Sequence, residues 1–199
     1  MKTLTKQERR ESAARDVQQA AKERDLDSMA GQDLLPYLAC GDGRVEMAAT
    51  DVLLQRGSDS VSVFLQGLAH PTGKIRATCA LLLDHVADDR CIEPLLHAIR
   101  HDPLEAVRRC ALHSLVCDGC KSCPLSTDVV AALIETAEND RSLAVRRRAV
   151  FYLSMQRPDP RAASFLKGLL AQTSDTALLR RAGNALPQHA RDARCLSEL

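Results

Sequence analysis

The chain has 199 residues, a length that permits one compact domain or one short repeat stack. Its 27 Lys and Arg nearly balance its 26 Asp and Glu, so the net charge of +1 gives no reason to expect nucleic-acid binding through overall charge. Aromatic residues make up 3% of the chain and Trp is absent, which favours many small helix contacts over one large core.

The N-terminal segment, residues 1–32, is predicted to form a charged helical cap. Residues 1–24 lack the apolar segment of a secretory signal, and no stretch of the sequence approaches the length that spans a bilayer. Eight cysteines in a chain without such a signal indicate reduced thiols. We therefore expect a cytoplasmic protein that does not bind a membrane.

A repeated pattern begins after the short apolar segment at residues 33–40. Each copy has an aliphatic anchor, in most copies an Arg directly after it, a small residue four positions later and a large aliphatic residue eight positions later. The anchors are 30, 32, 38 and 34 residues apart, at Val45, Ile75, Val107, Val145 and Leu179. Offsets of zero, four and eight lie in one stripe about 80° wide on a helix. Each copy is therefore predicted to be an amphipathic helix.

A second apolar segment precedes each anchor from the second copy onward. These segments span residues 61–68, 91–99, 129–137 and 163–170. Each segment and the anchor helix after it form an αα-hairpin, and hairpins stacked side by side form a solenoid. We predict an all-α fold, an α-solenoid of about five stacked antiparallel helix pairs over residues 33–186, followed by a C-terminal tail at residues 187–199.

The segments that begin at Asp102 and Asp140 are nearly the same. Residues 102–111 read Asp-Pro-Leu-Glu-Ala-Val-Arg-Arg-Cys-Ala, and residues 140–149 read Asp-Arg-Ser-Leu-Ala-Val-Arg-Arg-Arg-Ala. This pattern resembles the HEAT-repeat family, especially the short HEAT-like repeats of bacterial phycobilin-lyase-type proteins. The resemblance implies that the turn Asp and the helix Arg bridge adjacent repeats. Glu46 and Pro187 depart from the pattern in the first and last copies, as expected of repeats that cap a stack.

The step of 38 residues contains an inserted loop, residues 117–126. It carries Cys117, Cys120 and Cys123 at C-x2-C-x2-C spacing, and thiolates suit zinc or iron–sulfur clusters. His113, one helical turn before Cys117, would complete a zinc site of three cysteines and one histidine. The bacterial iron–sulfur pattern needs a further cysteine near residue 127, which the sequence lacks. We favour a loop of free or reversibly oxidised thiols without a cofactor, with zinc as the alternative.

Sequence motifs of catalysis are missing from the chain. No His is followed by Glu, and no H-E-x-x-H, Gly-rich phosphate loop or G-x-S-x-G motif occurs. The DNA glycosylases related to HEAT-type folds use Trp to hold a damaged base, and this chain has none. We therefore expect that the protein is not an enzyme.

Charge is distributed unevenly along the predicted stack. Residues 141–181 contain nine basic and two acidic side chains, whereas residues 101–140 contain three basic and seven acidic ones. Some of these arginines are assigned to the bridges between repeats, namely Arg108, Arg146 and Arg180. The arginines without such an assignment are a surplus of positive charge, and they are Arg109, Arg147, Arg148 and Arg181. This surplus favours an anionic partner, either an acidic protein or a phosphate backbone.

We predict a non-catalytic scaffold or adaptor that binds a protein partner through the concave surface of the stack. Offsets two and six of each repeat lie opposite the buried stripe and are expected to line that surface. The predicted binding residues at these offsets are Leu81, Arg109, His113, Arg147, Phe151 and Arg181. Two alternatives remain, a protein that binds the nucleic-acid backbone through the basic C-terminal repeats, and a thiol-sensing or zinc-sensing module.

Overall fold

The computed structural model of the chain describes residues 5, 12, 15, 19–121 and 123–190. Residues 1–4, 6–11, 13–14 and 16–18 of the predicted N-terminal cap, and the part of the predicted tail beyond residue 190, lie outside the described residues. Within the described part of the chain, all regular structure is helical. The predicted all-α fold is therefore confirmed.

The first repeat is formed from short elements that lead into one long helix. They are the 3-10 helices η1 (Leu26–Ser28) and η2 (Leu35–Ala39) around α2 (Gly31–Leu34), followed by α3 (Gly43–Gln55). Asp42 begins α3 as its N-cap, because its side chain accepts a hydrogen bond from the backbone N–H of Arg44.

Four helix pairs follow the first repeat. They are α4 (Val61–Gly67) with α5 (Gly73–Val86), α6 (Ile92–His101) with α7 (Glu105–Val116), α8 (Val129–Asn139) with α9 (Leu143–Leu153), and α10 (Pro160–Gln172) with α11 (Thr176–Ala190). Two further 3-10 helices, η3 (Gly57–Ser60) and η4 (Asp89–Cys91), lead into α4 and α6.

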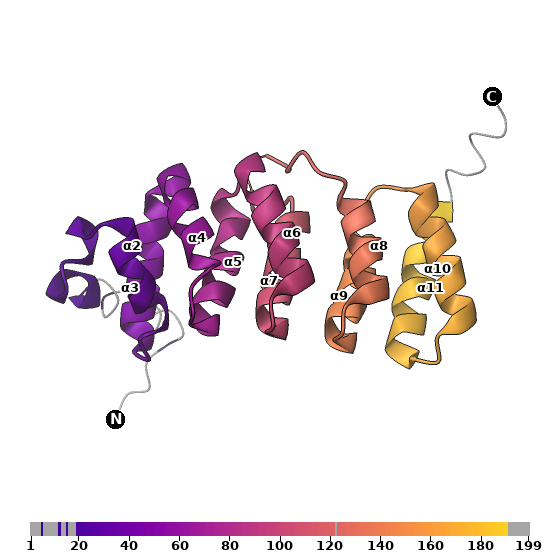
Figure 1. Cartoon of the computed structure of the whole chain (residues 1–199), viewed down its shortest axis with the longest axis horizontal. Helices are drawn as coiled ribbons and strands as arrows, with labels where there is room; N and C mark the ends of the chain where they lie inside the picture. The colour runs from indigo at the N-terminus through magenta and orange to yellow at the C-terminus, as the bar shows by residue number, and fades with distance from the viewer. Residues whose placement is uncertain (1–4, 6–11, 13–14, 16–18, 122, 191–199) are drawn as a thin grey trace.

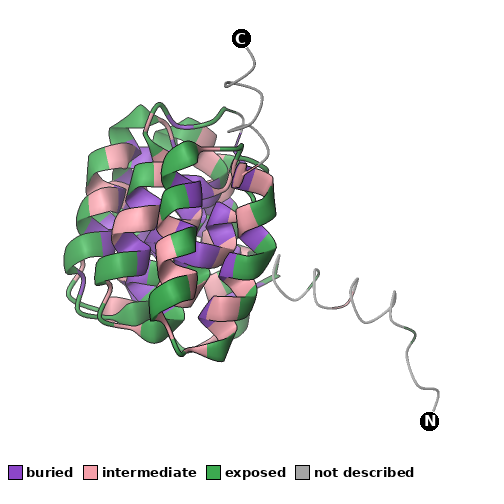
Figure 2. Ribbon diagram, turned by 90° about the vertical axis from the view of Figure 1, so that its right-hand side faces the viewer, coloured by how far each residue is buried: buried purple, intermediate pink, exposed green. Residues whose placement is uncertain are grey.

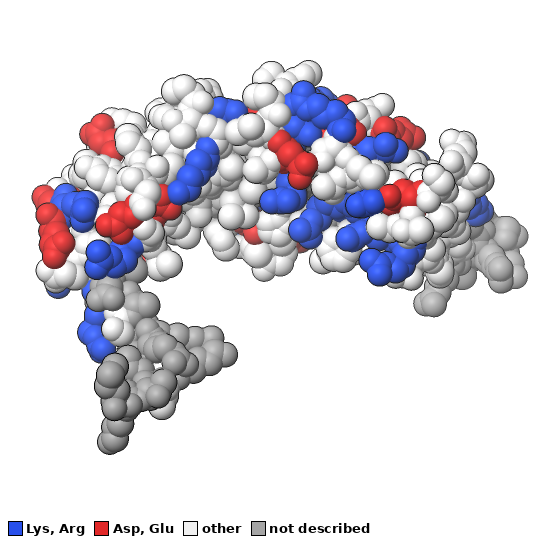
Figure 3. Space-filling model, turned by 90° about the horizontal axis from the view of Figure 1, so that it is seen from below, with Lys and Arg blue, Asp and Glu red and all other residues white. Residues whose placement is uncertain are grey.

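The helix pairs stand side by side along the long axis of the molecule (Figure 1). We call α3, α5, α7, α9 and α11 the inner row, and α4, α6, α8 and α10 the outer row. Seen end-on to the helices, the stack is an arch with one hollow side (Figure 3). The paired arrangement confirms the predicted solenoid.

The core lies between the two rows, where Figure 2 shows most of the buried residues. In the first four repeats every residue at offset eight is fully buried, and these residues are Leu53, Leu83, Leu115 and Leu153. The small residues at offset four are equally buried, and these are Ala49, Cys79, Ala111 and Ala149. Small side chains there allow neighbouring helices to approach closely.

The last repeat has a different register from the predicted one. Gly183 and Pro187, assigned to the buried stripe of α11, are exposed. The buried apolar residues of α11 are Leu178 and Ala182, each one residue before the predicted position, and Ala185, two residues before Pro187. The structural anchor of this repeat is therefore Leu178, because the apolar residues of the segment line up only from that position.

Bridges between arginine and aspartate join successive repeats. Arg76 of α5 donates to both carboxylate oxygens of Asp102 at 2.7 and 3.2 Å, and Arg108 of α7 donates to both oxygens of Asp140 at 2.8 and 2.9 Å. Each Asp also accepts a hydrogen bond from the backbone N–H two residues later. One carboxylate thus links two repeats and fixes the turn before the next helix.

The last junction uses a neighbouring arginine. Arg146, predicted to bridge repeats, donates to the carbonyl of Ala137 at 2.9 Å near the end of α8. Arg147 instead donates to both carboxylate oxygens of Asp175, which precedes α11. Arg180 is exposed on α11.

Candidate functional site

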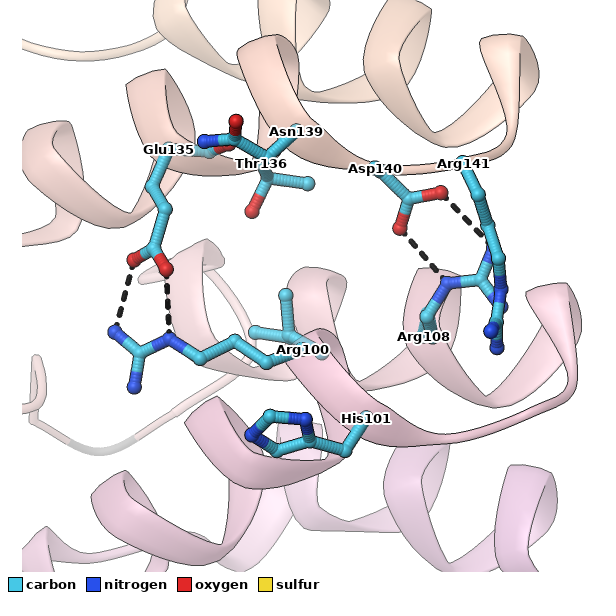
Figure 4. A pocket seen from close by; sticks show the side chains of 9 residues that line it. Arg100, His101, Arg108, Glu135, Thr136, Asn139, Asp140 and Arg141 are labelled. Atoms are coloured by element: carbon cyan, nitrogen blue, oxygen red, sulfur yellow. Dashed lines mark hydrogen bonds and ion pairs between the residues drawn. The ribbon is translucent and has the colours of Figure 1, made fainter.

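A cavity of about 290 Å³ opens between α6 and α8, near the C-terminal ends of these two helices. Figure 4 shows two arginine–carboxylate pairs among the side chains that line it. Arg100 donates to both carboxylate oxygens of Glu135 at 2.8 Å, and Arg108 is bound to Asp140. Because these charges are already satisfied, we interpret the cavity as a joint between repeats and place the candidate site on the inner row.

A line of three hydrogen-bonded side chains crosses the inner row. Asp84 near the end of α5, His113 of α7 and Tyr152 of α9 belong to three successive repeats. His113 Nε2 lies 3.0 Å from an oxygen of Asp84, and His113 Nδ1 lies 2.8 Å from the hydroxyl of Tyr152. Asp84 and Tyr152 are buried, at 2% and 7% exposure. Burial raises the pKa of Tyr152, so its hydroxyl remains protonated at neutral pH.

Two thiols lie beside this line. Cys117 ends α7 as its C-cap, and Cys120 follows in the inserted loop with its Sγ 3.6 Å from that of Cys117. One ligand atom from each of Asp84, His113, Cys117 and Cys120 lies within 4.8 Å of the other three. Hydrogen bonds to the Asp84 carboxylate and to Cys117 raise the pKa of the Cys120 thiol to about 11. We call these four residues the ligand cluster.

A buried lysine completes this region. The side chain of Lys121 is 1% exposed, and its Nζ lies 3.6 Å from Oδ1 of Asp84. Lys121 also donates a hydrogen bond to the carbonyl of Cys117. Among the described residues, Oδ1 of Asp84 is buried and has no hydrogen-bond partner. A buried carboxylate oxygen without a partner is costly, because it has lost its hydration.

The structure brings together three of the four predicted metal ligands, His113, Cys117 and Cys120. Cys123 is exposed and is not part of the ligand cluster. Asp84, 29 residues before His113, was missed in the sequence. The sequence contained one signal for this residue. Asp84 stands nine positions after the anchor of its repeat, and the equivalent position in the next copy is the buried Val116. Asp84 is therefore an acidic residue at a position where the repeat buries an apolar one.

Three side chains form a stack further along the inner row. Arg148 and Phe151 belong to α9, and Arg181 belongs to α11. The guanidinium carbons lie 5.8 Å (Arg148) and 5.4 Å (Arg181) from the centre of the Phe151 ring, distances of cation–π contacts. With Leu178 as the anchor of its repeat, Arg181 occupies the position in α11 that Arg148 occupies in α9. We call these three residues the arginine–phenylalanine stack.

Among the described residues, no carboxylate neutralises either arginine of this stack. Arg148 is exposed and has no hydrogen bond or ion pair within the described part of the chain. Nε of Arg181 is buried without a hydrogen-bond partner there. Figure 3 shows Lys and Arg gathered over the C-terminal half of the arch, several of them at its hollow side. The stack therefore presents uncompensated positive charge around an aromatic ring.

The remaining predicted binding residues have different surroundings. Leu81 is 44% exposed on α5. Arg109 is exposed, and its guanidinium lies 3.9 Å from the carboxylate of Glu105, which makes a long and weak surface ion pair. Arg147 is bound to Asp175, and this contact lowers the pKa of that carboxyl to about 2. His113 belongs to the ligand cluster.

Comparison with known proteins identifies the fold. The structure is similar to a chain in the complex of CpcE and CpcF of phycocyanin lyase from Nostoc sp. PCC7120, with a TM-score of 0.63 and 21% sequence identity over 78% of this chain and 97% of the other. No protein-family model matches the sequence, and neither does any curated protein. The match confirms the HEAT-like, phycobilin-lyase-like architecture expected from the resemblance. Among the described helices, none is long and apolar enough to cross a membrane.

The comparison corrects one prediction from the sequence. The absence of catalytic motifs led us to expect that the protein is not an enzyme. That expectation is wrong, because a stack of the same architecture belongs to a phycocyanin lyase. In such a stack, reactive side chains from separate repeats can converge without forming a local motif, as the line from Asp84 to Tyr152 illustrates.

Proposed function

We propose that the protein is an interaction subunit that binds an acidic surface of a partner protein through the inner row of its C-terminal repeats. The arginine–phenylalanine stack is the observation that carries this proposal. Arg and aromatic residues dominate binding energy at protein interfaces, because they combine apolar area with directional polar contacts. Binding of this kind is compatible with a catalytic role of the assembled complex.

The positive charge of the arginine–phenylalanine stack favours an acidic partner. Two guanidinium groups lie against one ring without a carboxylate partner in the described residues. A carboxylate from a partner could bind either guanidinium while an apolar side chain covers the ring. The similar lyase chain is itself part of a complex of two proteins, which supports a pairing role for this architecture.

Apolar side chains extend the same row towards the N-terminus. Met47 of α3 and Leu81 of α5 are large hydrophobic residues with 55% and 44% exposure. Together with Phe151 they offer apolar contacts along the inner row, whereas nucleic-acid backbone binding would require mainly basic groups. This mixed character favours a protein over nucleic acid.

The test compares charge reversals on the two rows. Arg148→Glu changes the inner row, and Lys167→Glu on the exposed face of α10 is the control with the same charge change on the outer row. Nuclease-treated native lysate is passed over each immobilised protein, and the retained proteins are quantified by mass spectrometry. We expect a defined acidic partner to be retained by the wild type and by Lys167→Glu, and to be lost with Arg148→Glu.

Two results would contradict this assignment. Equal retention of the partner by Arg148→Glu and by the wild type would show that the arginine–phenylalanine stack is not the binding site. Binding that is found only with untreated lysate, and that arbitrary DNA restores in a steeply salt-dependent manner, would favour nucleic acid instead. Far-ultraviolet circular dichroism of each variant verifies that the helices are intact.

A further inference from the structure

We propose that Asp84, His113, Cys117 and Cys120 form a zinc site that fastens the inserted loop to the inner row. The inference goes beyond partner binding and does not rest on it. It changes the ligand set expected from the sequence, since Asp84 takes the place assigned to Cys123. A site with four protein ligands has no open position, so its role is structural.

The distances fit a tetrahedral ion. Bonds of about 2.3 Å from zinc to sulfur place two sulfurs about 3.8 Å apart, and bonds of about 2.1 Å to nitrogen and oxygen place those atoms about 3.4 Å apart. The observed separations are 3.6 Å between the two Sγ atoms and 3.0 Å between His113 Nε2 and Asp84 Oδ2. All four ligand atoms fall within 4.8 Å of one another. The four ligand atoms are thus close enough together for one ion to contact all of them.

The donor atoms also fit zinc by their chemistry. Two thiolates and one imidazole are soft and borderline ligands, which select zinc over magnesium or calcium. Cys117 and Cys120 are separated by two residues, the spacing that lets one turn direct two sulfurs to a single ion. Cys117 stands at the C-terminal end of α7, where the helix dipole favours a cation.

Charges balance when the ion is included. Zinc with two thiolates and one carboxylate has a net charge of minus one, and the buried ammonium of Lys121 restores neutrality. Lys121 alone does not satisfy Asp84, because its Nζ is 3.6 Å from Oδ1 and that oxygen has no hydrogen bond within the described structure. An ion pair of Lys121 and Asp84 also leaves the convergence of His113 and the two thiols unexplained.

Tyr152 supplies the support that a metal-binding histidine needs. Ligating histidines commonly donate their second ring N–H to a fixed acceptor, which sets the tautomer and the orientation of the ring. With Nε2 directed to the ion, Nδ1–H of His113 donates to the Tyr152 hydroxyl at 2.8 Å. The zinc site would then connect α5, α7 and α9 where the inserted loop separates the repeats.

The test uses full-length protein purified under reducing conditions with a tag that contains no histidine. Zinc is measured by elemental analysis after addition of one equivalent and gel filtration, and cobalt replaces zinc in a second sample. We expect about one zinc per chain and, with cobalt, thiolate charge-transfer bands together with the strong visible bands of a tetrahedral complex.

Variants distinguish this ligand set from incidental thiols. Cys120→Ser and Asp84→Asn are expected to lose most of the bound zinc, whereas Cys123→Ser, three residues further along the same loop, keeps it. Tyr152→Phe should weaken zinc binding about 10-fold through loss of the support to His113, without changing the cobalt charge-transfer bands. Circular dichroism establishes that each variant is folded.

The inference is overturned if the wild type takes up neither metal. It is also overturned if Cys123→Ser and Cys120→Ser lose zinc equally, since the loop thiols would then bind metal without selection. A Cys117–Cys120 disulfide that persists under the reducing preparation would assign the pair to redox chemistry instead. None of these outcomes depends on partner binding, so failure of the zinc site and failure of the proposed function can be told apart.

Discussion

At the scale of single residues, the bridge between Arg108 and Asp140 is distinguished by the burial of both side chains. The Arg108–Asp140 pair has side-chain exposures of 3% and 4%, and Arg108 also donates to the carbonyl of Asp102 at 3.1 Å. Removal of one partner leaves a buried charge without compensation, which costs far more than the net contribution of the intact pair. The bridge therefore makes the stack sensitive to single substitutions at this position.

Arg108→Ala should lower the free energy of unfolding by about 3 kcal/mol, because Asp140 would remain buried without its partner. Arg146→Ala should cost about 1 kcal/mol, since that side chain donates only to a carbonyl. Arg109→Ala is the matched control, adjacent in sequence but exposed, and should change stability by less than about 0.5 kcal/mol. Urea unfolding measures all three. Equal effects of Arg108→Ala and Arg109→Ala would contradict the bridge.

The Asp102 carboxylate gives stability a defined pH dependence. Burial alone would raise the pKa of Asp102, but hydrogen bonds from Arg76 and from the backbone N–H of Leu104 more than offset it and lower this pKa from its ordinary value of 3.8. Because the folded-state pKa is the lower one, Asp102 stabilises the fold above about pH 4, and this contribution is lost as the pH falls through the folded-state pKa.

Asp102→Asn should therefore be less stable than the wild type at neutral pH, and the difference should shrink as the pH falls below about 4. Unfolding in urea at a series of pH values measures this difference. Asp51→Asn, on the exposed face of α3, is the control and should follow the wild type throughout. A difference between Asp102→Asn and the wild type that is constant with pH would exclude the assigned ion pair.

At the scale of helices, the sequence pattern predicts the first four repeats well because their buried stripe is unambiguous. Anchors, small residues and offset-eight leucines are all buried as expected. The last repeat differs, because Leu178 and Leu179 are both aliphatic and the pattern cannot choose between them. Packing selects Leu178, which buries Ala182 and Ala185.

The ligand cluster was only partly predictable for a different reason. His113, Cys117 and Cys120 lie within one helix and its following turn, so helical spacing brings them together. Asp84 reaches them from the preceding repeat, 29 residues earlier than His113. Contacts between repeats depend on the packing of α5 against α7, which no local pattern specifies.

The close approach of α4 to α5 can be tested at Gly67 of α4. A Cβ atom at this position would lie 2.2 Å from Sγ of Cys79 and 3.1 Å from Leu35. Gly67→Ala should therefore destabilise the fold by about 1–3 kcal/mol despite the better helix propensity of Ala. Gly183→Ala, in α11 with no atom within 4 Å, is the control and should stabilise by up to about 1 kcal/mol.

The double variant Gly67→Ala/Cys79→Ala separates the steric contact from other effects. Removal of the sulfur should recover part of the loss, giving a favourable coupling energy in the double-mutant cycle. Thermal and urea unfolding provide the four stabilities. Additive effects of the two substitutions would contradict the close packing of α4 against α5.

At the scale of the whole molecule, the inserted loop divides the stack into two parts. The joint between α6–α7 and α8–α9 contains the cavity of about 290 Å³, and it is held by the Arg100–Glu135 and Arg108–Asp140 pairs and by the contact of His113 with Tyr152. A metal at the ligand cluster would strengthen this joint on the inner row.

Removal of the metal from the zinc-loaded protein should therefore act locally. We expect a chelator to speed amide hydrogen exchange at the C-terminal end of α7 and in α9, and to leave α3 unchanged, because opening of one junction does not require the first repeat to unfold. Exchange that rises uniformly along the stack would indicate a global effect of the metal instead.

The most direct measurement of the proposed function replaces Phe151 with a photoreactive phenylalanine analogue. Phe165 of α10 on the outer row is the matched control, since both rings are half-buried. After irradiation in native lysate, we predict covalent adducts to one acidic protein from position 151 and none from position 165. Adducts from position 165 alone, or the same adducts from both positions, would contradict binding through the inner row.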